Sequence, residues 1–135
     1  MNYRPAAMSA ILLLFVAGVP VLAHHSVQAQ FDLNKPITLT GKITKVEWIN
    51  PHSYLWMDVN DENGTVKRWA LEMAGPGALR KAGLSRADRG GLKAGDTVTV
   101  NAVRAKDGTD LALMKDVKVS DGRVFTIWTN DPNAQ

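Results

Sequence analysis

The feature that most constrains the fold is a 23-residue stretch, Ile37–Val59, in which β-forming residues flank an Asn-Pro-His corner. Before the corner, apolar residues alternate with polar ones, but their parity changes between Ile43 and Val46. Because successive side chains of a strand point to opposite faces, this change predicts a β-bulge near Thr44 and Lys45. A long strand that bends midway can pair on both sides, as strands of small closed barrels do.

Turn residues divide the rest of the chain into further short strands. Alternating apolar residues predict strands at 53–59, 66–73, 97–105, 111–119 and 124–128, with a helical turn at 78–82. Three antiparallel strands, a helical connection and two more strands are the order of an OB-fold. An all-β, OB-like five-stranded Greek-key barrel with a short C-terminal strand is therefore predicted over residues 37–128. A small sandwich or open roll with the same hairpins is the alternative.

The first residues have the pattern of a secretory signal. Arg4 is the only charge before the apolar run at 11–19, and small residues precede a cleavage site predicted after Ala23. The apolar run is shorter than the roughly 20 residues of a membrane-spanning helix. We therefore expect a signal peptide at 1–23, a leader at 24–36, the barrel domain at 37–128 and a loose tail at 129–135. A cut after Ala29 is the less favoured alternative.

Charge and composition narrow the classes of function. Removal of Arg4 with the signal leaves 15 basic and 13 acidic residues, a balance that does not favour nucleic acid or an anionic membrane as partner. The chain has no cysteine and therefore neither disulfides nor thiolate chemistry. It also contains no nucleophile elbow, phosphate loop or HExxH motif, so an enzyme is not predicted. We expect a periplasmic or secreted bacterial protein that binds a metal ion or small ligand, with no membrane insertion after cleavage.

Several short motifs are spread over nearly the whole mature chain. They are His24-His25-Ser26, Phe31-Asp32, Lys35-Pro36, Leu39-Thr40-Gly41, Val46-Glu47-Trp48, Asn50-Pro51-His52, Lys93-Ala94-Gly95-Asp96 and Ala105-Lys106-Asp107-Gly108. In this combination the chain resembles a family of small exported bacterial proteins of unknown function. The resemblance implies export and a small barrel, and it implies no activity.

The three histidines are the candidate metal ligands. Cleavage after Ala23 would make His24 the N-terminal residue, with His25 next to it, and His52 lies at the strand corner. An N-terminal amine, its own imidazole and a further imidazole form a nitrogen-only site that suits Cu(II). Copper held by His24 and His52, with His25 assisting, is the preferred hypothesis. A site of His25 and His52 without the amine would have too few protein ligands for zinc. The structural alternative is a flexible polar leader and a histidine that caps a turn.

A second hypothesis concerns the outer face of the second and third predicted strands. Tyr54 and Trp56 share one parity, and Arg68 is expected on the same face of the next strand. Exposed aromatic rings beside an arginine can stack on sugars or contact a protein. These residues therefore predict a sugar- or protein-binding module as the alternative function. The structural alternative is that Trp56 covers an open end of the barrel.

Overall fold

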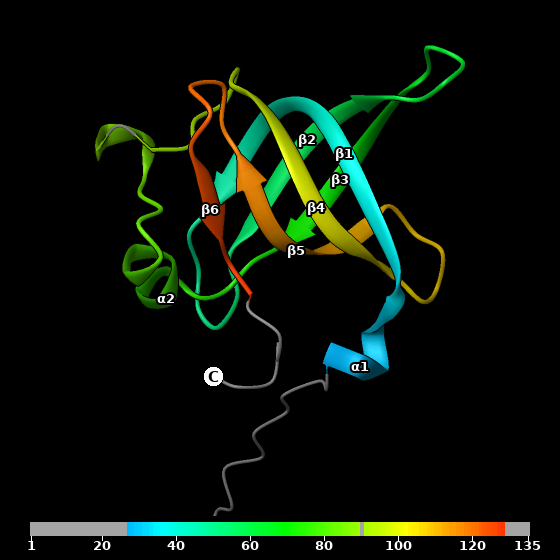
Figure 1. Ribbon diagram of the computed structural model, residues 1–135, viewed down its shortest axis with the longest axis horizontal. Helices are drawn as coiled ribbons and strands as arrows, with labels where there is room; N and C mark the ends of the chain where they lie inside the picture. Colours follow the sequence, from blue (N-terminus) through cyan, green and yellow to red (C-terminus); the bar gives the residue numbers. More distant parts are fainter. Residues whose placement is uncertain (1–26, 90, 129–135) are drawn as a thin grey trace, which may run out of the picture.

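The computed structural model describes residues 27–89 and 91–128 (Figure 1). The predicted signal peptide, His24, His25 and the predicted tail lie outside the described residues. The elements are α1 (Val27–Gln30), β1 (Phe31–Glu47), β2 (Tyr54–Asn60), β3 (Val66–Glu72), α2 (Pro76–Lys81), the 3₁₀ turn η1 (Ala87–Arg89), β4 (Thr97–Ala105), β5 (Leu111–Lys118) and β6 (Val124–Thr126). In the described part, no helix is long and apolar enough to cross a membrane.

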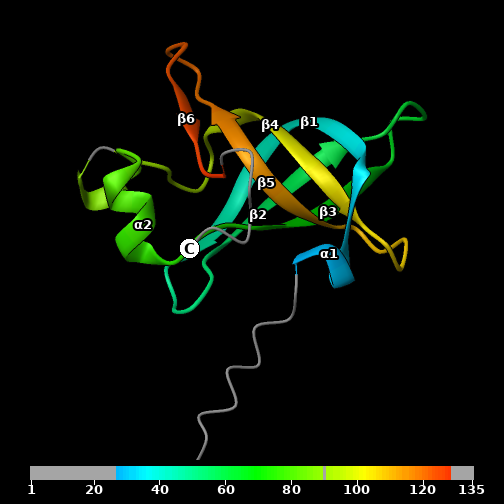
Figure 2. The ribbon, with the colours of Figure 1, turned by 60° about the horizontal axis from the view of Figure 1, so that its bottom comes forward.

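Six strands form one mostly antiparallel sheet in the order β3-β2-β1-β4-β5-β6, accompanied by two short helices (Figures 1 and 2). β3 also pairs with β5 in parallel, through Ala70–Leu111 and the two residue pairs that follow. Each strand therefore pairs with the next in the order β1, β2, β3, β5 and β4, and β4 pairs with β1, so these pairings form a ring. The inward residues form one core, which includes Leu55, Leu71 and Val100, each 0% exposed.

The long first strand has the predicted bulge and an earlier start than predicted. Its register with β2 shifts between Ile43 and Lys45, which confirms the bulge. However, β1 begins at Phe31, which pairs with Ala105 and is only 1% exposed. The register of β1 with β4 shifts between Phe31 and Pro36, and the turn-forming residues lie at this irregularity. Residues 31–36, predicted to be leader, are therefore part of β1.

The close crossing of β1 and β2 requires glycine at position 41. A Cβ atom at Gly41 would collide with the backbone oxygen of Asp58 and would lie 2.9 Å from Cε of Met57. Gly41 pairs with Val98 on the other side of the strand. The absence of a side chain therefore lets the curled β1 approach β2 while it keeps its pairing with β4.

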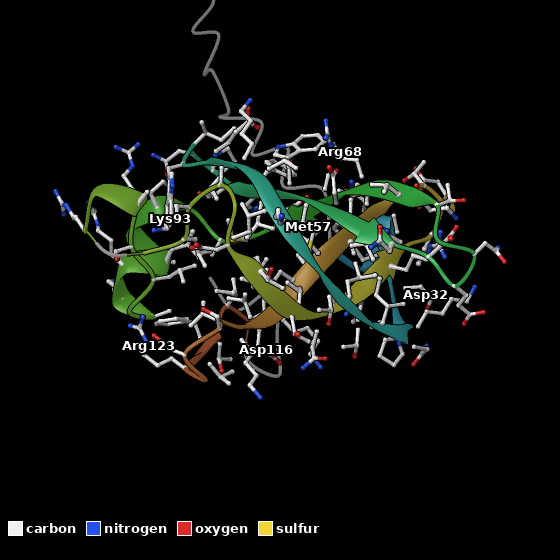
Figure 3. All side chains as sticks on the ribbon, turned by 90° about the horizontal axis from the view of Figure 1, so that it is seen from above. Asp32, Met57, Arg68, Lys93, Asp116 and Arg123 are labelled. Carbon is white, nitrogen blue, oxygen red and sulfur yellow. The ribbon has the colours of Figure 1, made fainter. Side chains whose placement is uncertain are left out.

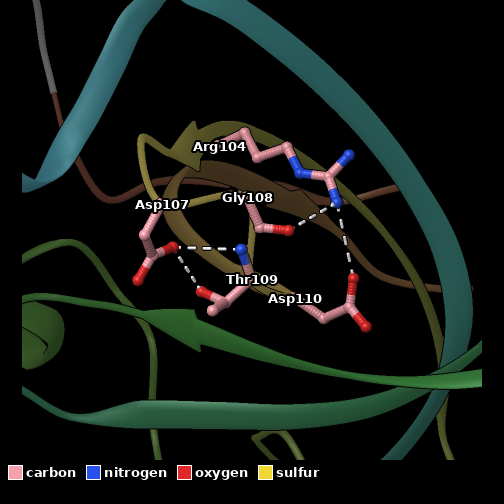
Figure 4. Close-up of polar contacts among 5 residues, drawn as sticks. All are labelled: Arg104, Asp107, Gly108, Thr109 and Asp110. Carbon is pink, nitrogen blue, oxygen red and sulfur yellow. Dashed lines mark hydrogen bonds and ion pairs between the residues drawn. The ribbon is translucent and has the colours of Figure 1, made fainter.

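The turn between β4 and β5 is held by its own side chains (Figure 4). Oδ1 of Asp107 accepts hydrogen bonds from the backbone N–H and the hydroxyl of Thr109, at 3.0 and 2.7 Å, and these bonds lower the pKa of Asp107. Arg104 donates to the carbonyl of Gly108 at 3.2 Å and lies 3.5 Å from Asp110. These contacts close the turn and give the cluster a structural role.

Candidate functional site

The corner between β1 and β2 is tied to the end of β3. The N–H of Ser53 donates to the carbonyl of Ala74 at 3.2 Å, and the N–H of Met73 donates to the carbonyl of Ser53 at 2.8 Å. A Cβ atom at Gly75 would lie 2.7 Å from the carbonyl oxygen of Pro51, so the corner packs closely on the start of the helical connection. The residue between Pro51 and Ser53 is His52, which is thereby held beside the last residue of β3.

That last residue, Glu72, pairs with His52. Nδ1 of His52 lies 2.7 Å from Oε1 of Glu72, and the hydroxyl of Tyr54 donates to Oε2 at 3.2 Å. The Glu72 side chain is 5% exposed, whereas that of His52 is 26% exposed. A buried carboxylate needs such partners, because burial of an uncompensated charge is costly. Both carboxylate oxygens of Glu72 therefore have a donor.

Trp128 forms a wall of the same site. Its ring meets the His52 ring edge to face, with centroids 6.4 Å apart and planes at 82°. Trp128 is 5% exposed, and its backbone N–H donates to the carbonyl of Lys115 at 3.2 Å. The segment after β6 thus packs against one side of the imidazole.

The environment of Tyr54 keeps its hydroxyl neutral. Burial, the charge of Glu72 and the hydrogen bond to Glu72 raise the pKa of Tyr54 to about 12. The phenol is therefore a hydrogen-bond donor to the carboxylate across the physiological pH range. On the same face, hydrogen bonds from Lys45 and Trp56 lower the pKa of Glu47.

The described residues include one histidine, His52, and contain no complete metal site. Among residues 27–89 and 91–128, no group of three or more histidine, aspartate, glutamate or cysteine side chains is placed to hold a metal ion. The predicted ligands His24 and His25 lie outside these ranges. The structure therefore shows the position of His52 and not its relation to the other two histidines.

The residues of the alternative site share one outer face, where their polar groups already have partners. Tyr54 lies opposite Glu72, and the indole N–H of Trp56 donates to Glu47 at 3.3 Å. Arg68 makes two hydrogen bonds with Asp58, at 2.8 and 3.0 Å, and these bonds lower the pKa of Asp58. In Figure 3, Met57 lies between the strands, whereas Arg68 lies on the outside.

The contact between Glu72 and His52 is not predicted from the sequence, although part of it follows from the hairpin. With a turn at 61–64, the register places Asn60 opposite Val66 and hence Tyr54 opposite Glu72. Strand parity puts Glu72 on the outer face, where a carboxylate is expected to be exposed. Instead it is buried and paired with His52 of the corner, and Trp128, which packs on the His52 ring, is distant in sequence and bears no local signal of this contact.

Comparison with known proteins gives a family and no activity. No curated protein matches the chain. The solved structures similar to it include that of Rim1, a mitochondrial single-stranded DNA-binding protein from S. cerevisiae, at 12% identity and a TM-score of 0.45, over 69% of this chain and 98% of that one. A family model described as a family of unknown function matches residues 12–114. The chain therefore belongs to this family, DUF6152.

Proposed function

We propose that this protein is an exported, OB-like small barrel that binds Cu(II) through His52 and its mature N-terminus. The observation that carries the proposal is the pairing of His52 with the buried Glu72. The ring of pairings through β1, β2, β3, β5 and β4 supports the barrel, with β6 as an added strand. The role would be copper handling or delivery, with no catalytic step.

The Glu72 carboxylate prepares His52 as a ligand. A carboxylate accepts hydrogen bonds and does not donate them, so its contact with Nδ1 places the proton on that nitrogen. Nε2 is then the ring nitrogen that can offer its lone pair to a metal ion. Metal-bound histidines usually donate their other ring N–H to a carboxylate or carbonyl, which fixes the ring and raises its basicity. His52 has this arrangement and remains partly exposed.

His52 alone provides too few ligands for copper, and the mature N-terminus would supply the other nitrogen ligands. Cleavage after Ala23 gives His24 a free amine beside its imidazole, and only three peptide bonds separate it from Val27. Three residues extend over about 10 Å. β1 curls so that α1 and the corner lie toward the same end of the fold (Figures 1 and 2). His24 and His52 would be the principal ligands, and His25 would assist.

The experiment is a calorimetric Cu(II) titration of protein exported and cleaved by a bacterial host, with its mature mass verified. We expect one tightly bound ion per chain, and loss of that site in His52→Ala and in a chain with one alanine inserted before His24. Glu72→Gln should weaken binding about 10- to 100-fold, because it removes the carboxylate behind the ligand. The matched control is Glu47→Gln, which changes a glutamate that contacts Trp56 and should leave copper affinity unchanged.

Two results would contradict the copper proposal. The first is weak binding that none of these changes affects. The second is a measured mass which shows that the mature chain begins after Ala29, because that cleavage removes His24 and His25.

The second candidate is a sugar- or protein-binding module on the outer face of β2 and β3. It is favoured by the shared face of Tyr54, Trp56 and Arg68, on which Trp56 is half-buried. Because Arg68 is paired with Asp58, an uncharged ligand that stacks on Trp56 suits the face better than an anion. Trp56→Ala should abolish retention on an oligosaccharide array, whereas His52→Ala should not affect it. Unchanged retention in Trp56→Ala would remove this candidate.

A further inference from the structure

We propose a second binding site, for a small organic polyanion that carries a ring, in the cavity between the strand corner and the α2–η1 connection. The cavity has a volume of about 500 Å³. Trp48 and Asn50 line it from the corner, and Arg80, Arg86 and Arg89 line it from the connection. Nothing in the copper proposal uses these five residues.

The connection concentrates positive charge around the cavity. Residues 75–93 contain five basic residues and one acidic residue, Asp88, in a chain whose net charge is only +3. Among the described side chains, no ion pair or hydrogen bond involves the guanidinium groups of Arg80, Arg86 and Arg89. By contrast, Arg68 and Arg123 each pair with a carboxylate. None of the carboxylates whose side chains the structure describes therefore competes with an anionic ligand for the three cavity arginines.

The backbone that carries these arginines is well anchored. Leu79 and Leu84 are 0% and 1% exposed, and the N–H of Leu84 donates to the carbonyl of Leu79 at 2.9 Å. The carbonyl of Arg86 accepts the N–H groups of Arg89 and Gly91, both at 3.0 Å. A preformed loop loses less conformational entropy on binding than a loop that must order itself. The positions of the three arginine backbones are thus set before the ligand arrives.

The lining residues define the ligand class. Guanidinium groups bind carboxylates and phosphates through paired, charge-assisted hydrogen bonds, and three of them require an anion with more than one charge. Trp48 is half-buried and supplies an aromatic surface, and the amide of Asn50 supplies a further polar group. The volume is within the range of small-molecule sites. A polycarboxylate or organic phosphate with a ring against Trp48 fits this combination.

The test uses trimesate and citrate, which both carry carboxylates, one on a planar ring and the other on a flexible chain. Phenyl phosphate is the arm that separates phosphate from carboxylate recognition. Binding to the processed full-length mature protein would be measured by calorimetry at low salt and followed by the indole signals of tryptophan in NMR spectra. The variants are Arg86→Gln, the triple Arg80→Gln/Arg86→Gln/Arg89→Gln, and Trp48→Leu. The matched control, Lys67→Gln/Lys115→Gln/Lys118→Gln, removes the same charge at exposed positions on β3 and β5.

We expect trimesate to bind one to one and more tightly than citrate. Arg86→Gln should weaken binding about tenfold or more, as expected for loss of a charged hydrogen-bond donor. The arginine triple variant should abolish binding, and Trp48→Leu should remove the preference for trimesate over citrate. The lysine triple variant should bind within a factor of a few of the unaltered protein.

The proposal is overturned if none of the three probes binds, or if the two triple variants lose affinity equally, because binding then follows net charge alone. Circular dichroism confirms that each variant is folded before its affinity is interpreted. The copper site has separate variants and a separate probe, so failure of either proposal leaves the other intact.

Discussion

Nδ1 of His52 lies 2.7 Å from Oε1 of Glu72, at the point where the corner after β1 meets the end of β3. Glu72 is buried, and His52 is the one histidine among the residues that the structure describes. A charged acceptor in a low-dielectric setting makes this a strong hydrogen bond. The pairing directs Nε2 of the imidazole away from the carboxylate.

The first prediction concerns the tautomer of His52. In the metal-free protein at neutral pH, the ring should carry its proton on Nδ1, because Glu72 accepts from that atom. Glu72→Gln should weaken this preference, since a neutral amide is a poorer acceptor than a carboxylate. Nitrogen-15 chemical shifts of the labelled ring report the tautomer directly. An unchanged ratio of tautomers in Glu72→Gln would show that Glu72 does not control the ring, and Glu47→Gln serves as the control.

The second prediction concerns stability. Glu72→Ala should lower the free energy of unfolding by about 1–3 kcal/mol, because it leaves the partly buried donors of His52 and Tyr54 without their acceptor. Chemical denaturation of the metal-free protein measures this change. Glu47→Ala, on the more exposed part of the same face, should change stability by only about 0.5 kcal/mol. Equal losses in the two variants would contradict a special role for the buried carboxylate.

The third prediction concerns alkaline pH. The folded protein raises the pKa of Tyr54 to about 12 from an ordinary value of 10.0. Above pH 10 the unfolded chain therefore loses this proton while the folded chain keeps it, so the tyrosine contribution to stability declines as pH rises from 10 towards 12. The other tyrosine of the sequence is Tyr3, which the proposed signal cleavage would remove, so absorbance of the mature protein at alkaline pH would report Tyr54 alone.

The control for this titration is Tyr54→Phe. Lysines also titrate in this range, and the difference between the two proteins isolates the tyrosine. The unaltered protein should lose more stability than Tyr54→Phe between pH 10 and 12. A Tyr54 absorbance transition centred near pH 10 in the folded protein would contradict the account.

The fourth prediction concerns the curl of β1. Gly41→Ala should destabilise the fold by about 1–3 kcal/mol, because its Cβ would collide with the backbone of Asp58, which cannot move without breaking strand pairing. Gly77→Ala is the matched control, since a Cβ there has no neighbour within 4 Å. That change should be neutral or stabilise by about 0.4–1 kcal/mol. Thermal unfolding distinguishes the two outcomes, and equal effects would contradict the close crossing of β1 and β2.

Local patterns predicted much of the sheet. Alternation and glycine turns placed β4 at its observed bounds, and the parity change predicted the bulge between Ile43 and Lys45. The start of β1 was predicted too late, because Asn34 and Pro36 are turn formers by local propensity. Burial of Phe31 and its pairing with Ala105 override that propensity through contacts distant in sequence.

The candidate site was predicted less completely than the sheet. His52 could be chosen from its residue type and its corner, but its pairing with a buried Glu72 and its contact with Trp128 join segments that are distant in sequence. The arginine cavity shows the same limit. The sequence predicts a helical turn at 78–82, whereas α2 begins at Pro76 and brings Arg80 to the same cavity as Arg86 and Arg89. The path of the chain after α2 brings these arginines together, and their spacing in the sequence does not predict it.

The most direct measurement of the central claim is the EPR spectrum of the Cu(II)-loaded mature protein, with histidine labelled by nitrogen-15. We predict a tetragonal, nitrogen-rich spectrum, with hyperfine coupling to more than one imidazole and loss of the His52 contribution in His52→Ala. Binding should also weaken as pH falls, because the amine and imidazoles must lose protons to coordinate copper. A spectrum of copper bound mainly by oxygen, identical in the unaltered protein and in His52→Ala, would contradict the account.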